Sequence, residues 1–283
     1  MKIIECPRDA MQGLSKFIPT DKKISYINQL LAVGFDTIDF GSFVSPKAIP
    51  QMRDTAQVLQ NLNWSESKSK LLAIVANVRG ATDASKFEGI TYLGFPLSIS
   101  ETFQQRNTNK SIAEALNEVS EIQNICKQTG KELVTYISMG FGNPYGDLYD
   151  TDVVHKFVEI LIVLDIKVIS LADTIGIATP GHITTLFSSL TKTYNTAELG
   201  VHLHSNPKTA WQKVEAAYQA GCKRFDGALK GFGGCPMAED ELVGNLATET
   251  ILAYLSDQGD APVLDMHAFH LSMALAEEIF PNH

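Results

Sequence analysis

Two histidines separated by one residue, His202 and His204, have the type and spacing that most directly suggest chemistry in this 283-residue chain. They stand in an apolar, β-branched stretch, 199–204, that predicts a strand. Alternation along a strand places both imidazoles on one face, about 6.5–7 Å apart along the chain. Such a pair can share one divalent metal ion, although a pair of structural histidines explains the motif alone equally well.

A charged pair, Arg8 and Asp9, follows the first apolar stretch of the chain. Asp9 could give an oxygen ligand to a metal ion, and Arg8 could stabilise a developing oxyanion. A structural salt bridge is the alternative interpretation of this pair. Joined to two imidazoles, the carboxylate completes a ligand set that suits Mg²⁺, Mn²⁺ or a similar divalent ion.

Polar residues also follow two other strand-like stretches. Asp173, beside Thr174, could orient a ligand or accept a proton, or it could simply hydrogen-bond the loop that it begins. Ser42 and Lys47 combine a hydroxyl with an ammonium group, which suits a substrate carboxylate or phosphate. A solvated turn is the simpler interpretation of that second segment.

A glycine-rich segment, residues 231–236, carries the thiol of Cys235. Glycines let the backbone approach a ligand closely, and a thiol with a suitable pKa can transfer a proton. A lone cysteine is more often an inert, small side chain. Ten residues later, Asn245 offers an amide oxygen that could complete a metal shell or cap a helix.

The elements that must position these residues alternate between strand-like and helical stretches, which is typical of parallel strands joined by crossover helices. The predicted strands are residues 2–5, 36–40, 71–76, 91–96, 132–137, 167–172, 199–204 and 223–228. Eight such units predict a (β/α)8 TIM barrel, whose catalytic groups gather where strands end. A doubly wound sheet is the rival, but the first strand lacks the glycine fingerprint that such a sheet favours.

Local helix signals support this organisation. Thr20 or Asp21 is expected to cap one helix, Asp150 or Thr151 another, and Pro180 suits a first helical turn. Residues 262–280 have apolar positions at helical spacing and predict an extra C-terminal helix. No linker divides the chain, so we expect one domain over residues 1–283.

The composition restricts the classes of partner. With 45% hydrophobic residues, 19% charged residues and a net charge of −9, the chain is expected to be globular and to bind neither nucleic acid nor membrane. The N-terminal stretch lacks the apolar core of a signal peptide. Four scattered cysteines form no CxxC pair. These features favour reduced thiols and a cytoplasmic location.

Taken together, the motifs resemble the hydroxymethylglutaryl-CoA lyases, which belong to a superfamily of metal-dependent barrel enzymes. The resemblance spans nearly the whole chain and rests on the order and spacing of several short segments. These segments are residues 7–9 with Gln12, 42–47 with 50–52, 100–103 with Asn107 and Asn109, 173–176, 202–204, 233–236 and 244–249.

The resemblance implies a metal shell of Asp9, His202, His204 and Asn245. It makes Arg8 and Cys235 catalytic residues, and we add Asp173 to them as a candidate base. The substrate would contact Gln12, Ser42, Lys47 and Thr174. It also implies an acyl-CoA substrate and a homodimer. Basic residues on the predicted mouth loops could hold coenzyme A phosphates, or could be ordinary solvated charges: Lys16, Lys47, Arg106 and Lys110.

Several positions depart from the family pattern. Asp39 stands where the family has a catalytic glutamate, Ala10 replaces a usual glycine, and Ser205 with Asn206 replaces aspartate and threonine. Lys230 stands where a small residue is usual, and the loop from Cys235 to Asn245 is one residue longer than in the animal-type lyases. A related 3-hydroxyacyl-CoA is therefore an alternative substrate.

The implied reaction is a retro-Claisen cleavage of 3-hydroxy-3-methylglutaryl-CoA to acetyl-CoA and acetoacetate. Asp173 is the first choice for the base that deprotonates the tertiary hydroxyl, and His202 is the second. Arg8 would stabilise the thioester enolate, and Cys235 would protonate it. The alternatives are a condensing enzyme of the same superfamily and a non-catalytic barrel that senses metal or acyl-CoA.

Overall fold

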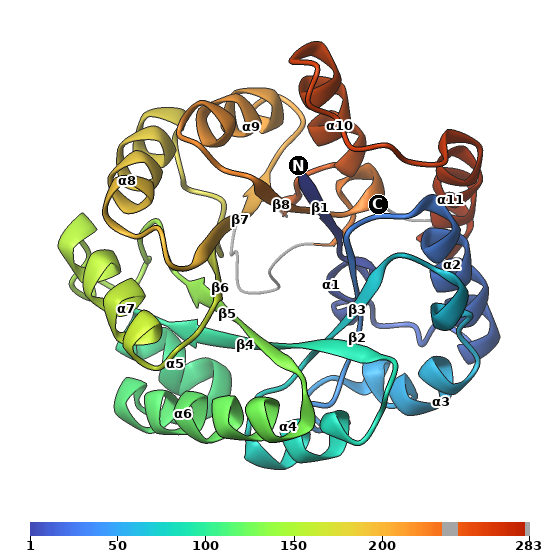
Figure 1. The fold of residues 1–283 in the computed structure, drawn as a ribbon, viewed down its shortest axis with the longest axis horizontal. Coiled ribbons are helices and arrows are strands. Elements are labelled where there is room, and N and C mark those ends of the chain that lie inside the picture. The colour runs from blue at the N-terminus through green and yellow to red at the C-terminus, as the bar shows by residue number, and fades with distance from the viewer. Residues whose placement is uncertain (234–242, 281–283) are drawn as a thin grey trace.

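Eight parallel strands close into a barrel in the computed structural model, which describes residues 1–233 and 243–280 (Figure 1). Each strand from β1 to β7 pairs with the next strand in sequence, and β8 pairs with β1 to close the ring. The strands are β1 (Lys2–Glu5), β2 (Thr37–Ser42), β3 (Lys70–Ile74), β4 (Ile90–Ser98), β5 (Glu132–Ser138), β6 (Val168–Asp173), β7 (Glu198–Ser205) and β8 (Arg224–Gly227). The predicted (β/α)8 TIM barrel is confirmed.

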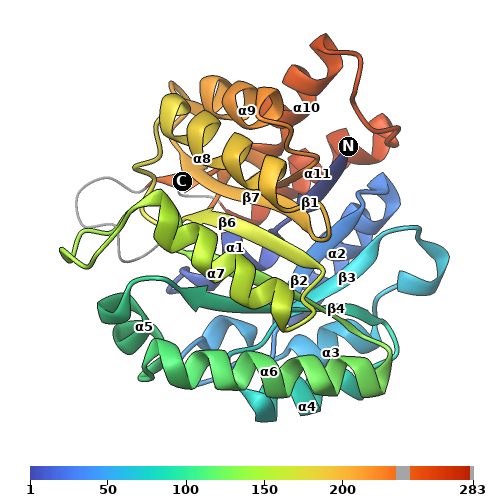
Figure 2. The same ribbon diagram turned by 60° about the vertical axis from the view of Figure 1, so that its left-hand side comes forward.

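Helices surround the barrel because each crossover buries its apolar stripe against the outer face of the sheet. Figure 2 shows α6 and α7 lying along the outside of the strands. The crossover helices are α2 (Thr20–Val33), α3 (Thr55–Gln60), α4 (Val78–Ser85), α6 (Ile112–Thr129), α7 (Thr151–Val163), α8 (Pro180–Thr193), α9 (Ala210–Gln219) and α10 (Thr248–Asp257). Among the described residues, no helix is long and apolar enough to cross a membrane.

The predicted C-terminal helix is also confirmed, as α11 (Met266–Ile279). It lies beside α2 (Figure 1). The ring of Phe269 meets Phe35 edge to face, with 6.4 Å between centroids, and Phe280 meets Tyr26 in the same way at 6.1 Å. These aromatic contacts hold the end of the chain against its beginning.

The two predictions of helix caps have different outcomes. Asp150 caps α7 as expected, because its side chain accepts a hydrogen bond from the Val153 backbone N–H. The prediction that Thr20 or Asp21 caps α2 is wrong, since Pro19 occupies the cap position and no side chain makes the cap hydrogen bond. The Thr20 hydroxyl instead donates to Asp54, 2.8 Å away on the next crossover.

Inside the barrel, alternate residues of each strand point inward. One side of the interior is apolar, and its buried cluster consists of Leu72, Ile74, Tyr92, Val134, Tyr136 and Val168. The opposite side carries charges from β8, where Arg224 and Asp226 are both buried. Gly200 on β7 leaves room for Arg224, because a Cβ atom there would lie 2.9 Å from the arginine Cδ. The barrel interior is therefore apolar on one side and charged on the other.

Candidate active site

The two histidines of β7 face into the barrel and converge. His204 is buried, His202 is partly buried, and their Nε2 atoms are 3.3 Å apart. Burial and the neighbouring His202 lower the pKa of His204 to about 4, so this ring is neutral at physiological pH. A neutral imidazole keeps the lone pair that a metal ion needs.

Asp9 joins the histidines from α1 (Pro7–Gln12), a short helix that begins two residues after β1 ends. The sequence predicts Arg8 and Asp9 at the end of the first strand; in the structure they lie within the helix that follows it. Donor atoms of Asp9, His202 and His204 lie within 4.8 Å of one another. Burial raises the pKa of Asp9, but the charge of Arg8, together with the neighbouring imidazoles and the Asn245 hydrogen bond, outweighs burial and lowers that pKa to about 2. The carboxylate is therefore ionised.

Asn245 reaches the same group from β9 (Gly244–Asn245), which pairs antiparallel with the end of β7 so that Asn245 lies opposite His204. Its side-chain nitrogen donates to Asp9 Oδ2 and to the Phe232 carbonyl, both at 2.9 Å. The four residues predicted as metal ligands are thus brought together. Carboxylate, imidazole and amide donors in this arrangement fit a divalent ion such as Mg²⁺ or Mn²⁺.

Arg8 contacts this group and is held by three side chains. Its guanidinium binds Asp39 through Nε and Nη2, and its Nη1 donates to Asp9 and Gln12 at 2.8 and 2.9 Å. Burial raises the pKa of Asp39 to about 6, with Asp9 and Asp226 adding to the rise against the opposing charge of Arg8. The shorter carboxylate at position 39 therefore still forms a buried pair with Arg8.

A cavity of about 460 Å³ opens onto these residues. Arg8, Asp9, His202 and His204 line one part of it, and Arg106, Asn107 and Thr108 of α5 (Glu101–Thr108) line another. Gln12 and Thr174, two of the predicted substrate contacts, also line the cavity. The cavity therefore connects the predicted metal ligands to a basic side chain, Arg106.

The other two predicted substrate contacts are not among the cavity-lining residues. Ser42 is buried, and its hydroxyl accepts a hydrogen bond from the Val44 backbone N–H, so it shapes the loop after β2. Lys47 is exposed on that loop. Its neighbours Ala48 and Ile49 line the cavity, which makes the segment a wall of the cavity.

Asp173, the first choice for the base, faces away from the cavity. Ala172 lies opposite His202 in the β6–β7 register and lines the cavity, so the next residue along the strand points to the outer layer. There the Asp173 carboxylate accepts hydrogen bonds from Lys213 Nζ at 2.8 Å and from the Ala178 backbone N–H. Lys213 also donates to the carbonyls of Gly176 and His204. The pair ties the loop after β6 to the end of β7.

This buried ion pair yields a stability prediction. Lys213→Met leaves the Asp173 carboxylate buried without its cation, and we expect the free energy of unfolding to fall by about 3–5 kcal/mol. Adding Asp173→Asn removes the stranded charge and should restore a large part of that loss. Urea denaturation of the two single variants and the double variant measures the coupling. Strictly additive losses would contradict the pairing.

Cys235 lies outside the described residues, but the segment that leads to it does not. Gly233 has a φ of +93°, and a Cβ atom there would lie 2.7 Å from the Asn245 side-chain nitrogen and 2.8 Å from the Ala10 Cα. Only glycine fits this position without strain. Gly233 therefore lies directly against the predicted ligand Asn245.

Glu5 is a further buried residue beside the site, and the sequence motifs do not include it. It is fully buried, and its carboxyl group accepts from the Leu229 backbone N–H at 2.9 Å and contacts the Thr248 hydroxyl at 2.6 Å. These two partners flank the glycine-rich segment on either side. Burial and the charge of Glu249 raise the pKa of Glu5 to about 8, so it is a neutral acid at pH 7. A charged residue at the end of an apolar strand was the available signal.

The raised pKa predicts a pH-dependent stability. The folded chain holds a proton on Glu5 that the unfolded chain loses near pH 4.5, so this contribution is complete below pH 4.5 and is lost as pH rises to about 8. Glu5→Gln preserves the neutral hydrogen bonds without titrating. Between pH 5 and 8, the stability of the variant relative to the parent should rise by up to about 4 kcal/mol. The free energy of unfolding of each protein is measured from pH 5 to pH 8. A difference between the two proteins that does not change with pH would contradict the assignment.

The comparison with known proteins agrees with this geometry. The family model described as HMGL-like matches residues 2–275. The chain belongs to the HMGL-like family. "Hydroxymethylglutaryl-CoA lyase YngG" of Bacillus subtilis is 35% identical over 254 residues, covering 90% of this chain and 84% of that protein. The cytoplasmic 3-hydroxy-3-methylglutaryl-CoA lyase of Rattus norvegicus is 32% identical over 94% of this chain and 77% of its own length.

A solved structure extends the likeness to the whole fold. An HMG-CoA lyase from Acinetobacter baumannii, in complex with coenzyme A and 3-methylmalate, superposes with a TM-score of 0.91 at 31% identity, covering 99% of this chain and 91% of that one. This HMGL-like chain is accordingly an enzyme of the HMG-CoA lyase class.

Proposed function

We propose that this HMGL-like protein cleaves 3-hydroxy-3-methylglutaryl-CoA to acetyl-CoA and acetoacetate with a divalent metal ion, Mg²⁺ or Mn²⁺. The observation that carries the proposal is the convergence of Asp9, His202 and His204, whose donor atoms lie within 4.8 Å beside a cavity. Asn245, which bonds to Asp9, would complete the shell. When bound, the ion supplies a Lewis acid that lowers the pKa of the substrate hydroxyl.

The remaining chemistry falls to the side chains. A base takes the hydroxyl proton, the bond between C2 and C3 of the acyl chain breaks, and its electron pair passes to the thioester as an enolate. Arg8 lines the cavity and would stabilise this negative charge. Cys235 would return a proton to C2, which gives acetyl-CoA.

Position favours His202 over Asp173 as the base. His202 lines the cavity, and its Nδ1 lies 3.2 Å from Asp226, which orients Nε2 toward the cavity. Because Nε2 is also the atom that would hold the ion, His202 could accept a proton there only when it is not a ligand, and we assign it to the metal shell. We assign Asp173 a positioning role through Lys213, which bonds the His204 carbonyl.

A basic residue in the cavity supports an acyl-CoA substrate. Arg106 lines the cavity and is the basic residue that we assign to the coenzyme A phosphates. A related 3-hydroxyacyl-CoA remains the alternative substrate, because positions 10, 39 and 205–206 depart from the family pattern. We further propose a cytoplasmic homodimer with one catalytic domain over residues 1–283.

The test is turnover. Metal-depleted protein, given 3-hydroxy-3-methylglutaryl-CoA, should form acetyl-CoA and acetoacetate in equal amounts only after Mg²⁺ or Mn²⁺ is restored. Cys235→Ala tests whether a bound ion alone suffices for turnover. With bound ion confirmed, this variant should lose most activity. Turnover that is indifferent to metal, or condensation without cleavage, would contradict the proposal. A chain that binds acyl-CoA without any turnover would instead be the sensor.

A further inference from the structure

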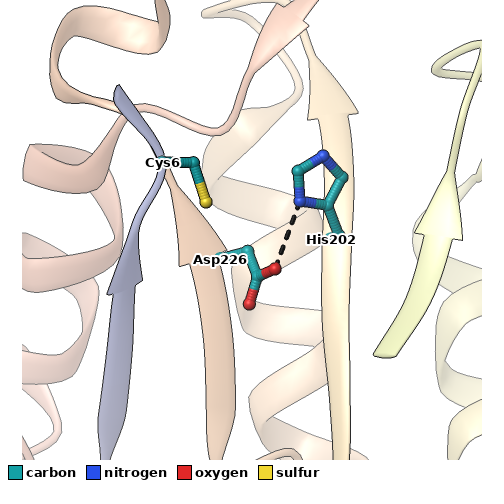
Figure 3. A group of neighbouring side chains, drawn as sticks. All are labelled: Cys6, His202 and Asp226. Atoms are coloured by element: carbon teal, nitrogen blue, oxygen red, sulfur yellow. Dashed lines mark hydrogen bonds and ion pairs between the residues drawn. The ribbon is translucent and has the colours of Figure 1, made fainter. Parts of the chain in front are cut away.

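A second group of potential metal ligands lies directly below the first. Cys6 immediately follows β1, Asp226 lies on β8 and His202 on β7, and these three strands are neighbours in the barrel. Figure 3 shows the three side chains pointing toward one another. One donor atom from each lies within 4.8 Å of the others. Cys6 and Asp226 are each 1% exposed, so the group is sheltered from solvent.

The two groups use opposite sides of one imidazole. His202 Nε2 faces His204 at 3.3 Å, while Nδ1 faces Asp226 Oδ2 at 3.2 Å. We call Asp9, His202 and His204 the upper group and Cys6, His202 and Asp226 the lower group. The upper group offers oxygen and nitrogen donors, which hard divalent ions accept. The lower group adds a sulfur donor, which favours a thiophilic ion of the zinc class.

The lower donors are not committed to strong bonds elsewhere in the described part of the chain. Asp226 Oδ1 is buried and has no hydrogen-bond partner among those residues. Cys6 Sγ makes one long contact, 3.6 Å to the Ile4 carbonyl. An ion of the zinc class bonds sulfur strongly and can displace the proton of such a thiol. A hard ion such as Mg²⁺, which bonds sulfur poorly, has no means to do so.

We propose that Cys6, His202 Nδ1 and Asp226 form a second metal site, specific for thiophilic divalent ions and exclusive of the first. On binding, the Cys6 thiol gives its proton to solvent and the imidazole proton moves from Nδ1 to Nε2, with no change of oxidation state. His202 then has no lone pair on Nε2 for the upper group. An ion of the zinc class would therefore withdraw one ligand from the upper site, and this binding does not depend on the lyase reaction.

The experiment separates the two sites with variants and uses Co²⁺ as the probe. A Cys235→Ala background removes the other thiol expected near the cavity, and His204→Ala weakens the upper site. This double variant should no longer bind Mn²⁺ but should still bind one Co²⁺ per chain. The bound Co²⁺ should show a thiolate-to-metal charge-transfer band in the near ultraviolet.

Adding Cys6→Ser to that background should abolish the band and weaken Co²⁺ binding by more than the roughly tenfold cost of losing an outer-shell partner. Adding Cys126→Ser instead is the matched control, because Cys126 is a buried thiol on α6, and the band should persist. A band that survives Cys6→Ser would overturn the proposal. So would a second tightly bound Co²⁺ in the Cys235→Ala protein, because the sites would then not exclude each other.

A measurement without the Cys6 variant guards against misfolding. X-ray absorption of zinc-loaded His204→Ala/Cys235→Ala protein should show one sulfur neighbour near the usual Zn–S distance of about 2.3 Å. A shell of nitrogen and oxygen neighbours alone would refute the lower site. Either result stands whether or not the enzyme cleaves hydroxymethylglutaryl-CoA, so failure of the second site and failure of the proposed function are distinguishable.

Discussion

His204→Ala is expected to abolish stoichiometric binding of Mg²⁺ or Mn²⁺ and, with it, turnover. The ring is neutral, buried and 3.3 Å from its partner nitrogen on His202, so its loss removes a ligand that no neighbour replaces in the described chain. Mn²⁺ affinity should fall by more than the roughly 10–100-fold that an outer-shell change costs. Electron paramagnetic resonance of added Mn²⁺ measures the free ion directly.

His270→Ala is the matched control for that experiment. His270 is an exposed histidine on α11, so its removal should change neither Mn²⁺ binding nor turnover. Unchanged Mn²⁺ binding in His204→Ala would restore the interpretation of the two histidines as a structural pair.

Arg8→Gln should lower kcat by about 10²–10³, equivalent to about 2.7–4 kcal/mol of transition-state stabilisation, the usual cost of removing an oxyanion donor. Arg8 lines the cavity beside Asp9, and its guanidinium is held in place by Asp39 and Gln12. The effect should appear in kcat with bound ion confirmed, because enolate charge develops only during cleavage.

Stability must be separated from catalysis in this variant. Arg8→Gln leaves Asp39 buried without its cation, which also destabilises the fold. Arg8→Gln combined with Asp39→Asn should recover stability in urea denaturation while kcat stays low. Recovery of full turnover along with stability would show that Arg8 acts only as a structural partner.

The fold was largely predictable because strands and helices alternate, and each leaves a local pattern of apolar residues in the sequence. All eight strands were placed within a few residues of their observed bounds, and Pro180 and Asp150 marked helix starts correctly. The Thr20 cap failed for a reason that no local pattern contains. Its hydroxyl bonds Asp54, a partner 34 residues away that only the packed helices bring close.

The site was predictable as a set of residues but not as a geometry. Asp9, His202, His204 and Asn245 converge as the family resemblance implied. The direction of Asp173 depends on the register between β6 and β7, which the sequence does not state. Asp226 was overlooked although it is a carboxylate within a predicted strand, and such a residue inside a barrel must face either a cation or a site.

The antiparallel pairing of β9 with the end of β7 has a consequence for divergence within this enzyme class. It fixes Asn245 opposite His204 by main-chain bonds, while Glu5 holds Leu229 and Thr248 on either side of the intervening segment. Insertions or deletions between these anchors leave the spacing of the ligands unchanged. The length of that segment can therefore change in evolution, or be changed by engineering, without moving Asn245 away from His204, provided that the proposed proton donor Cys235 is retained.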